Sequence, residues 1–462
     1  MFKKVFLVLA LAMTIVLAGF GCKGLSATQQ AATKPVTLEY WTVFDDVDAI
    51  KSMINSYRAT RPYLTVNIRQ LRVDEFYQRL VEALAEDRGP DIVSIRSKAL
   101  RAFQSKLAPM PASFNDTTVV IEKTTFGQNT VVTQTVKPLL TPSQLDKEYV
   151  QAVKNDVILD GQIYGLPLSL DTMAIYYNKD LLDRSSVPEP PKTWEEFAVA
   201  VKKITKYDKQ TNKITQSGAA LGAGNNIPGA DDLLSILFAQ SGVDFVNRGG
   251  AAVFNSVPQN KERGVETPSM GVMNFYTDFA NSTRDTYTWN EEMPNALDKF
   301  VNGSLGFFFG YAYHYPIIKS RAPQLNFGLL PMLQLNAERP VNAANYWVQA
   351  VVGKSPRQNE AWGLIDYLAH SPANKIYLDA TNRPTALRLY VAAQKEKEEL
   401  APFIDGALIA KSWYHGRDYD AAVKAVSDML REWLQEPPNP EKFLEFRQEI
   451  LNRAAAKINQ TL

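Results

Sequence analysis

Apolar residues follow two alternating periods along the chain from residue 36 onward. Val36 to Phe44 ("VTLEYWTVF") is rich in β-branched and aromatic residues, as strands are. The next stretch, 45–62, has apolar residues at helical spacing, and Pro62 ends it. "LTVNIRQLRV" predicts a second strand, a helix opened by Asp74 follows, and "PDIVSI" predicts a third strand. This alternation predicts an α/β lobe with a largely parallel sheet.

The same rhythm resumes after Tyr149. "DGQIYGLPLSLDTMAIYYNKDLL" contains a turn and then the strand "MAIYYN". "PPKTWEEFAVAVKKIT" predicts a helix in which Thr193 is the N-cap and Glu196 completes a capping box. "ADDLLSILFAQSG", "MGVMNFYTDFANS" and "NALDKFVNG" have helical spacing too. Two amphipathic helical stretches, 419–435 and 440–459, end the chain.

The segment between Pro111 and Pro142 has a different character, rich in Thr and Val. "TTVVIEKTTFGQNTVVTQTV" is typical of two β-rich arms about "FGQN", which predicts a hairpin inserted in the first lobe. A long irregular surface excursion is the alternative. The sequence leaves both open and assigns the segment no role.

The length and the net charge of the chain limit which architectures and which classes of partner are expected. The chain has 462 residues, too many for one ordinary core, so at least two lobes are expected. The formal net charge is +1 and no basic stripe stands out, which argues against a nucleic-acid partner.

The N-terminus predicts export. A basic start, Met1 to Lys4, precedes an apolar run from Val5 to Ala18 that is short for a membrane span and typical of a signal peptide. Small residues then precede Cys22, the only cysteine, as in a bacterial lipoprotein processing site, although Gly19 stands where Leu is usual. We therefore expect a signal peptide over 1–22, a lipid on Cys22 and a flexible tether over 23–35. Ordinary secretion with an incidental cysteine is the alternative.

The sequence contains no recognisable catalytic or cofactor motif. The pairs Glu195-Glu196 and Glu291-Glu292 are adjacent residues, which point about 100° apart on a helix and make poor acid/base couples. The three histidines are isolated and lack metal-ligand spacing. Phosphate loops and nucleophile elbows are also missing. We expect no catalysis, no cofactor and no metal.

Several quoted pieces occur in a recognisable order. "LEYWTVF", "GPDIVSI", "YGLPLSLDTMAIYYNKDLL", "PKTWEEF", "DKFVNGSLGFFFGYAYHYP" and "NEAWGLIDYLAHS" together resemble the bacterial extracellular solute-binding proteins of the maltose-binding type. These are receptors of sugar importers driven by ATP hydrolysis. The resemblance covers residues 36 to about 390 and is strongest from "YGLPLSLDTMAIYYNKDLL" to "PKTWEEF".

The resemblance implies two α/β lobes joined by hinge crossings, with the solute held between them. It places the crossings near Asp171 to Ala174, near Phe327 to Pro331 and after Leu368 to Ser371. The lobes are then 36–170 plus 332–371, and 175–326 plus 372–462.

A rule independent of the family indicates where a ligand would lie. In open α/β sheets, ligands bind beyond the carboxyl ends of strands. A sugar also needs flat rings for its C–H faces and polar groups for its hydroxyls. The strand ends that offer such residues are Trp41, Thr42, Phe44 and Asp45, then Arg96 and Ser97, then Gly310, Tyr311 and Tyr313.

Each candidate for the site has a structural alternative. Trp41 is also expected as a buried strand end, Asp45 or Asp46 as a helix cap, and Asp171 as a turn residue. "NAANYWVQ" favours a loop that returns Tyr346 and Trp347 to the cleft. Arg383 follows the third crossing and is either a cleft residue or a surface turn residue. The predicted ligand-binding residues are Trp41, Asp45, Asp171, Tyr311, Tyr313, Tyr346, Trp347 and Arg383.

The aromatic stretch from Gly303 to Lys319 divides into two parts. Phe307 to Phe309 fit a strand buried on both faces and are expected in the core. Tyr311 to Tyr315 are expected in the strand-to-helix connection, with His314 packed inside and Pro316 in the first turn of the helix.

The resemblance and the export signal together predict a monomeric extracytoplasmic receptor, lipid-anchored to a bacterial membrane. It would capture a sugar or oligosaccharide and deliver it to the permease of an ABC transporter. The alternatives are a secreted glycan-active enzyme and a receptor scaffold adapted to sensing or adhesion. The sequence does not identify the solute.

Overall fold

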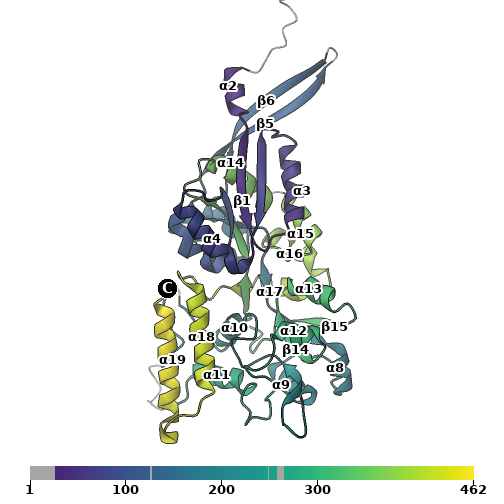
Figure 1. Cartoon of the computed structure of the whole chain (residues 1–462), viewed down its shortest axis with the longest axis vertical. Helices are drawn as coiled ribbons and strands as arrows, with labels where there is room; N and C mark the ends of the chain where they lie inside the picture. The colour runs from purple at the N-terminus through teal and green to yellow at the C-terminus, as the bar shows by residue number, and fades with distance from the viewer. Residues whose placement is uncertain (1–25, 125–126, 248, 258–264, 371) are drawn as a thin grey trace, which may run out of the picture.

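The protein has two lobes stacked along its longest axis (Figure 1). A computed structural model describes residues 26–124, 127–247, 249–257, 265–370 and 372–462. The predicted signal peptide with Cys22 lies outside these ranges, as do Phe126 and Ser371.

The first lobe is built on a six-stranded sheet in the order β2-β1-β3-β17-β4, with β9 also on β17. β1 runs parallel to β2 and β3, whereas β17 is antiparallel to its neighbours because the chain returns to this lobe from the second one. The sheet is therefore mixed rather than largely parallel. Its strands are β1 (Val36–Thr42), β2 (Leu64–Gln70), β3 (Ile92–Arg96), β4 (Leu107–Ala108), β9 (Leu166–Pro167) and β17 (Trp347–Val352).

Helices cover this sheet where the spacing predicted them. α3 begins after Asp46, whose carboxylate accepts a hydrogen bond from the Ala49 amide at 2.8 Å, so Asp46 rather than Asp45 is the cap. The helices and turns of this lobe are α3 (Val47–Arg58), α4 (Val73–Ala85), η1 (Ser97–Ala99), α5 (Leu100–Phe103), η2 (Gln104–Lys106), α6 (Pro142–Glu148), α7 (Gln151–Val157), α14 (Gln358–His370) and α15 (Pro372–Thr381); the small strands β7 (Ile158–Leu159) and β8 (Gln162–Ile163) pair beside them.

The second lobe is built on a five-stranded sheet in the order β12-β13-β14-β11-β15. Gly218 lets α9 lie close to this sheet, because an added Cβ would stand 2.4 Å from the Val201 carbonyl oxygen. The strands are β11 (Ala174–Asn178), β12 (Lys206–Tyr207), β13 (Ile214–Ala219), β14 (Leu305–Gly310) and β15 (Phe327–Pro331). The helices are α8 (Lys179–Arg184), α9 (Trp194–Ile204), α10 (Ala230–Gln240), α11 (Pro268–Asp278), α12 (Ala296–Val301), α13 (His314–Arg321), α18 (Tyr419–Trp433), η3 (Pro440–Lys442) and α19 (Phe443–Asn459).

A small three-stranded sheet lies where the lobes meet. β10 (Asp171–Thr172) pairs with β16 (Asn342–Asn345), and β16 pairs with β18 (Ala410–Lys411). The chain leaves the first lobe through β10 into β11, near the predicted first crossing. It returns between β16 and β17. α16 (Arg388–Lys395) and α17 (Ala401–Ala407) follow later in the chain.

Two of the lobe boundaries in the structure differ from the predicted ones, because side-chain packing assigns the segments concerned to the other lobe. The second crossing does not fall within β15, because β15 pairs with β11 along its whole length and Met332 and Leu333 still belong to the second core. The stretch after residue 372 does not begin the second lobe either. α15 packs on α3 and α14, and the chain as far as Leu387 contributes to the first core.

The Thr- and Val-rich segment is a β-hairpin that projects from the first lobe (Figure 1). β5 (Ser113–Thr124) and β6 (Gly127–Pro138) pair over their full length, so the hairpin prediction is confirmed. The buried Asp116 carboxylate anchors its base by accepting hydrogen bonds from the Arg61 guanidinium at 2.7 and 2.8 Å. Near it lies a short helix, α2 (Ala27–Ala32), within the stretch predicted as a tether; Ser26 and Gln29 form its capping box.

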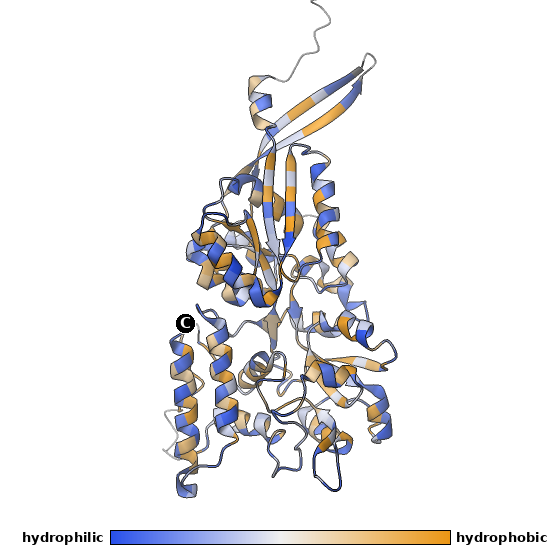
Figure 2. Ribbon diagram, in the orientation of Figure 1, coloured by the Kyte–Doolittle hydropathy of each residue, from blue (hydrophilic) through white to orange (hydrophobic). Residues whose placement is uncertain are grey.

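Hydropathy along the ribbon matches the predicted periods (Figure 2). Along the hairpin the apolar residues form a block, with Val119 and Val120 paired to Val132 and Val131, and α18 and α19 each carry an apolar stripe. Two large hydrophobic cores form, one in each lobe, with a smaller one under β14. Phe307 to Phe309 are buried as predicted. Within the described ranges, no helix has the length and apolar character needed to cross a bilayer.

Candidate ligand-binding cleft

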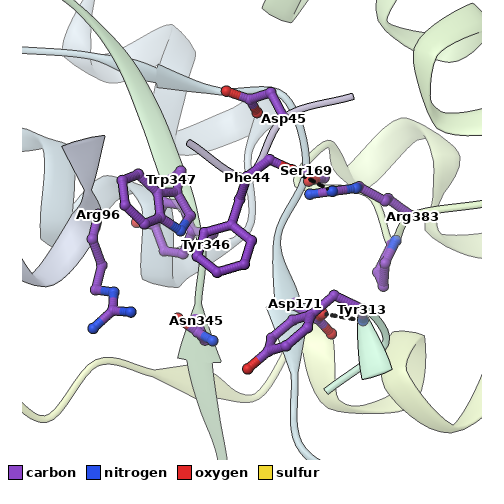
Figure 3. Close-up of a pocket in the computed structure, with 11 residues that line it drawn as sticks. Phe44, Asp45, Arg96, Ser169, Asp171, Tyr313, Asn345, Tyr346, Trp347 and Arg383 are labelled. Atoms are coloured by element: carbon purple, nitrogen blue, oxygen red, sulfur yellow. Dashed lines mark hydrogen bonds between the residues drawn. The ribbon is translucent and has the colours of Figure 1, made fainter. Parts of the chain in front are cut away.

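A cleft lies between the lobes at the ends of β1, β3 and β14 (Figure 3). Its lining comes from both lobes and from the crossing segments. Water molecules can be centred in about 50 Å³ of it, and about 570 Å³ of space within it, open solvent included, holds no protein atoms. The lining residues are Phe44, Asp45, Arg96, Ser169, Asp171, Tyr313, Asn345, Tyr346, Trp347, Arg383 and Pro384.

Three aromatic rings from different segments meet in this cleft. The Phe44 ring, directly after β1, lies 5.5 Å from the Trp347 ring and 5.9 Å from the Tyr313 ring, centre to centre. Phe44 and Trp347 belong to the first lobe, whereas Tyr313 caps α13 of the second. Aromatic surface is therefore supplied from both sides.

Asp45 and Arg383 lie on one side of these rings. The Asp45 carboxylate is buried and accepts hydrogen bonds from the Thr42 hydroxyl at 2.6 Å and from the Gln349 amide at 3.3 Å. Arg383 donates to the Phe44 carbonyl oxygen at 2.5 Å. Burial lowers the pKa of the Arg383 guanidinium, but nearby groups, Asp45 among them, more than offset this and raise it. Both charges are engaged within the protein.

Asp171 joins the first crossing to the second lobe. Its carboxylate accepts hydrogen bonds from the backbone amides of Ala312 at 2.8 Å and Tyr313 at 3.1 Å, so it holds the connection before α13 in place. Burial raises the pKa of Asp171 to about 7, although these amides and Arg383 oppose the shift. Asp171 therefore has the structural role of a turn residue that was its alternative. It also lines the cleft.

Arg96 lies on the other side of the rings. It ends β3, and its guanidinium carbon is 5.7 Å from the Trp347 ring centre and 5.6 Å from that of Tyr419. Burial lowers the pKa of Arg96, but the neighbouring Tyr419 and Tyr77 raise it above its ordinary value overall. Figure 3 shows Arg96 and Arg383 on opposite sides of Phe44 and Trp347.

Six of the eight predicted residues line the cleft, and Trp41 and Tyr311 do not. Trp41 is buried in the first core, with the Arg69 guanidinium over its ring at 5.1 Å, so it has the structural role that was its alternative. The Tyr311 hydroxyl donates to Asp232, and its ring stacks on Tyr313 at 5.7 Å, so it supports the lining from behind.

Tyr346 reaches the cleft only in part, since its hydroxyl donates to the buried Asp156 at 2.7 Å. Phe44 and Arg96 were among the strand-end residues but not among the eight candidates. Their position directly after β1 and at the end of β3 was the available signal. Asn345 belongs to the polar run before Tyr346 and Trp347 that favoured a cleft position, whereas Ser169 and Pro384 had no signal beyond their neighbours.

His314 packs inside the second lobe, as predicted. Its Nδ1 accepts the Tyr311 amide hydrogen at 2.9 Å, and burial lowers its pKa to about 3, so the ring is neutral. α13 begins at His314, so the connection spans only 311–313 rather than 311–315. No cluster of metal-ligating side chains occurs in the described part of the chain.

Comparison with known proteins gives a consistent result. A family model described as bacterial extracellular solute-binding protein matches residues 52–402. A putative binding protein of Brucella abortus is 22% identical over 361 residues, covering 76% of this chain and 75% of the relative. A maltodextrin-binding protein of Bacillus subtilis is 26% identical over 303 residues, covering 64% of each chain.

The fold has close counterparts among solved structures. A cyclo/maltodextrin-binding protein complexed with maltotetraose superimposes with a TM-score of 0.68 at 14% identity, covering 92% of this chain and 97% of that one. At this identity the likeness concerns the two-lobed α/β fold alone. The family model spans most of the chain, and the chain therefore belongs to the bacterial extracellular solute-binding proteins.

Proposed function

We propose that the protein captures a sugar or an oligosaccharide between its lobes and delivers it to the permease of an ABC transporter. The observation that carries this proposal is the meeting of Phe44, Trp347 and Tyr313 from two lobes in one cleft. Aromatic faces suit the C–H face of a sugar ring, and the surrounding amide, hydroxyl and charged groups suit its hydroxyls. The similarity to a maltodextrin-binding protein supports the same class of solute.

The proposed mechanism is closure about the crossing segments. A ligand that contacts both lobes stabilises the closed arrangement because it loses half of its contacts when the lobes separate. Asp171 couples the first crossing to the loop that carries Tyr313. Ligand binding at Tyr313 would thereby be linked to the geometry of the hinge.

The carboxylates of the cleft favour binding over bond cleavage. A glycosidase needs one carboxyl group free to donate a proton and a second free to attack or to activate water. Asp45 accepts hydrogen bonds from Thr42 and Gln349, and Asp171 accepts two from backbone amides. We therefore propose a receptor that leaves its ligand chemically unchanged.

The proposal includes a lipid anchor on Cys22 and a monomeric, extracytoplasmic protein. A thermal-shift screen over neutral and acidic oligosaccharides, followed by calorimetry, tests the binding function. The expected result is saturable binding at one site per chain and recovery of intact ligand. Turnover of the ligand, or no binding by any saccharide, would contradict the proposal.

A further inference from the structure

Arg96 stands between the cleft and a second cavity. It lines both, and the second cavity lies between α4 and α5 of the first lobe and the start of α18 of the second. Within this cavity the rings of Tyr77 and Phe103 stack at 5.6 Å. Arg96 is the residue that the two linings have in common. The second cavity is lined by Tyr77, Arg96, Ala99, Ala102, Phe103, Arg417, Asp418, Tyr419 and Asp420.

The Arg96 guanidinium has no partner among the residues that the structure describes. It forms no ion pair or hydrogen bond there, and its Nε is buried without an acceptor. An arginine carries five N–H donors and stays charged, and a donor that is buried without an acceptor, as Nε is here, is costly. Such a group is expected to meet its acceptor in a ligand.

The nearby carboxylates are engaged elsewhere. Asp231 accepts hydrogen bonds from the Trp413 indole at 3.0 Å and from the Tyr419 hydroxyl at 2.6 Å. Asp232 is paired with Lys98 and accepts from Tyr311.

Two further carboxylates, Asp418 and Asp420, line the second cavity. Asp418 caps α18 by accepting the Ala421 amide hydrogen at 3.0 Å, and both side chains are exposed. Neither is among the groups that act most strongly on the Arg96 charge. Arg417 also lines the second cavity without an ion pair among the described residues, but it is exposed. Arg96 differs from it because it lines both cavities and has a buried donor without an acceptor.

The surroundings of Arg96 also orient it. Its guanidinium lies near the Trp347 ring and the Tyr419 ring, one from each lobe, within the range of cation–π attraction. Rings on the faces of a guanidinium leave its edges for hydrogen bonding, and two parallel N–H groups match a carboxylate. Arg383, the other arginine of the cleft, is occupied by the Phe44 carbonyl and has Asp45 and Asp171 beside it.

We propose that the captured saccharide is acidic and that Arg96 binds its anionic group, a carboxylate as in a uronic acid residue. This inference rests on the proposed function and adds a ligand class to it. Neutral parts of the saccharide would contact Phe44, Trp347 and Tyr313, while the acidic group would lie beside the Arg96 guanidinium. A sulfate or phosphate ester would present the same charge to the same arginine.

The test compares acidic saccharides with neutral counterparts of the same backbone. The probes are trimers of galacturonic, glucuronic and mannuronic acid, each beside its methyl ester, together with a sulfated and a phosphorylated neutral trimer. Calorimetry on the full mature chain should show the acid binding at least about tenfold more tightly than its ester for one backbone. Raising the ionic strength should lower the affinity for the acidic saccharide and leave the affinity for its ester unchanged. Tighter binding of the sulfated or phosphorylated trimer would assign the same site to an ester anion.

Two variants of Arg96 test whether tighter binding of the acid than of its ester depends on this residue. Arg96→Gln should remove the difference between acid and ester, and Arg96→Lys should retain part of it. Arg69→Gln, an exposed arginine outside the cleft, is the matched control and should change nothing. Unliganded melting curves verify that each variant folds.

The outcomes separate this inference from the proposed function. Equal binding of an acid and its ester, or an acid preference that survives in Arg96→Gln, would overturn the role of Arg96 and leave the sugar receptor intact. If only neutral saccharides bind, the role of Arg96 is likewise overturned and the sugar-receptor function stands. Failure of every saccharide to bind would contradict both.

Discussion

The Lys98 ammonium group forms an ion pair with the Asp232 carboxylate across the boundary between the two lobes. Lys98 follows β3 of the first lobe, and Asp232 lies in the first turn of α10 of the second. Their side chains are only 1% and 5% exposed. Burial raises the pKa of Asp232, against which Lys98 acts by favouring the charged form. Each charge is therefore compensated only while the lobes are together.

Removing one member of this pair should favour the open arrangement. In Lys98→Met the Asp232 charge stays buried and unpaired when the lobes close, which costs about 3 kcal/mol, so ligand affinity should fall at least about tenfold. Small-angle scattering should show a larger radius of gyration without ligand.

The double variant Lys98→Met with Asp232→Asn should recover much of the loss, because no unpaired charge remains. Lys202→Met breaks an exposed pair with Asp285 and serves as control, since exposed pairs contribute little. An unchanged radius and affinity in Lys98→Met would show that the pair does not bias closure.

Trp347 should contribute to ligand binding and Trp41 should not. Trp347→Ala removes an aromatic face of the cleft and is expected to weaken binding of the identified saccharide about tenfold. Trp41→Phe alters a ring in the core behind β1 and should leave affinity unchanged. Calorimetry on both variants checks this, and equal losses would mean that the cleft is not the binding site.

Tyr313 and Tyr311 offer a second contrast. Tyr313→Ala removes a ring that lines the cleft, so affinity should fall by a similar factor. Tyr311→Phe keeps the ring stacked on Tyr313 and loses only the hydroxyl that donates to Asp232, so it should lower stability by about 1 kcal/mol with a smaller effect on affinity. Urea unfolding and calorimetry separate the two effects. A greater affinity loss in Tyr311→Phe than in Tyr313→Ala would reverse the assignment.

Asp171 should make the protein less stable as the pH rises from 3.8 to about 7. Its pKa is raised to about 7 in the folded protein, so the folded state binds a proton that the unfolded chain has released in this window. Stability from this group is complete below 3.8 and is lost as the pH rises through about 7, with a slope of at most about 1.4 kcal/mol per pH unit.

Asp171→Asn removes this titration. Urea unfolding of both proteins across the window should show a flatter dependence of the unfolding free energy on pH in the variant. Parallel curves would contradict the raised pKa, whatever the difference in absolute stability between the two proteins.

Cys22 should be required for attachment of the protein to the membrane. Cys22→Ser removes the acceptor of the proposed lipid, so the protein should move from the detergent phase to the aqueous phase in partitioning experiments on whole cells. Trp347→Ala, with Cys22 intact, should stay in the detergent phase. A wild-type protein found wholly in the aqueous phase would favour ordinary secretion.

Much of the fold was present in local patterns. The alternation of periods predicted β1, α3, β2, α4 and β3 in order, and Thr193 caps α9 by accepting the Glu196 amide hydrogen at 3.2 Å. The predicted capping box is not completed, because the Glu196 carboxylate accepts from the Lys192 amide at 2.8 Å instead. Phe307 to Phe309 were predicted as core because an apolar run without polar alternation suits a strand covered on both faces. These features depend on neighbours in the sequence and need no knowledge of distant contacts.

The lobe boundaries depended on distant contacts and were misplaced for that reason. Whether the chain after residue 372 packs on one lobe or the other is decided by the fit of α15 against α3 and α14, more than three hundred residues from α3 in the chain. The extension of the second lobe through Leu333 likewise depends on its packing in the second core.

The sequence by itself determined the strand ends after β1, β3 and β14 that carry cleft residues, because the carboxyl ends of parallel strands meet at one edge of a sheet. Tyr346 and Trp347 come to the same edge from the amino end of β17, which is antiparallel to β3. Only the tertiary structure decided which of those side chains face the cleft. Trp41 turns into the core and Tyr311 lies behind Tyr313, while Phe44 and Arg96 line the cleft. The unpartnered state of Arg96 is tertiary as well, since it depends on Asp231 and Asp232 of the other lobe being engaged by their own donors.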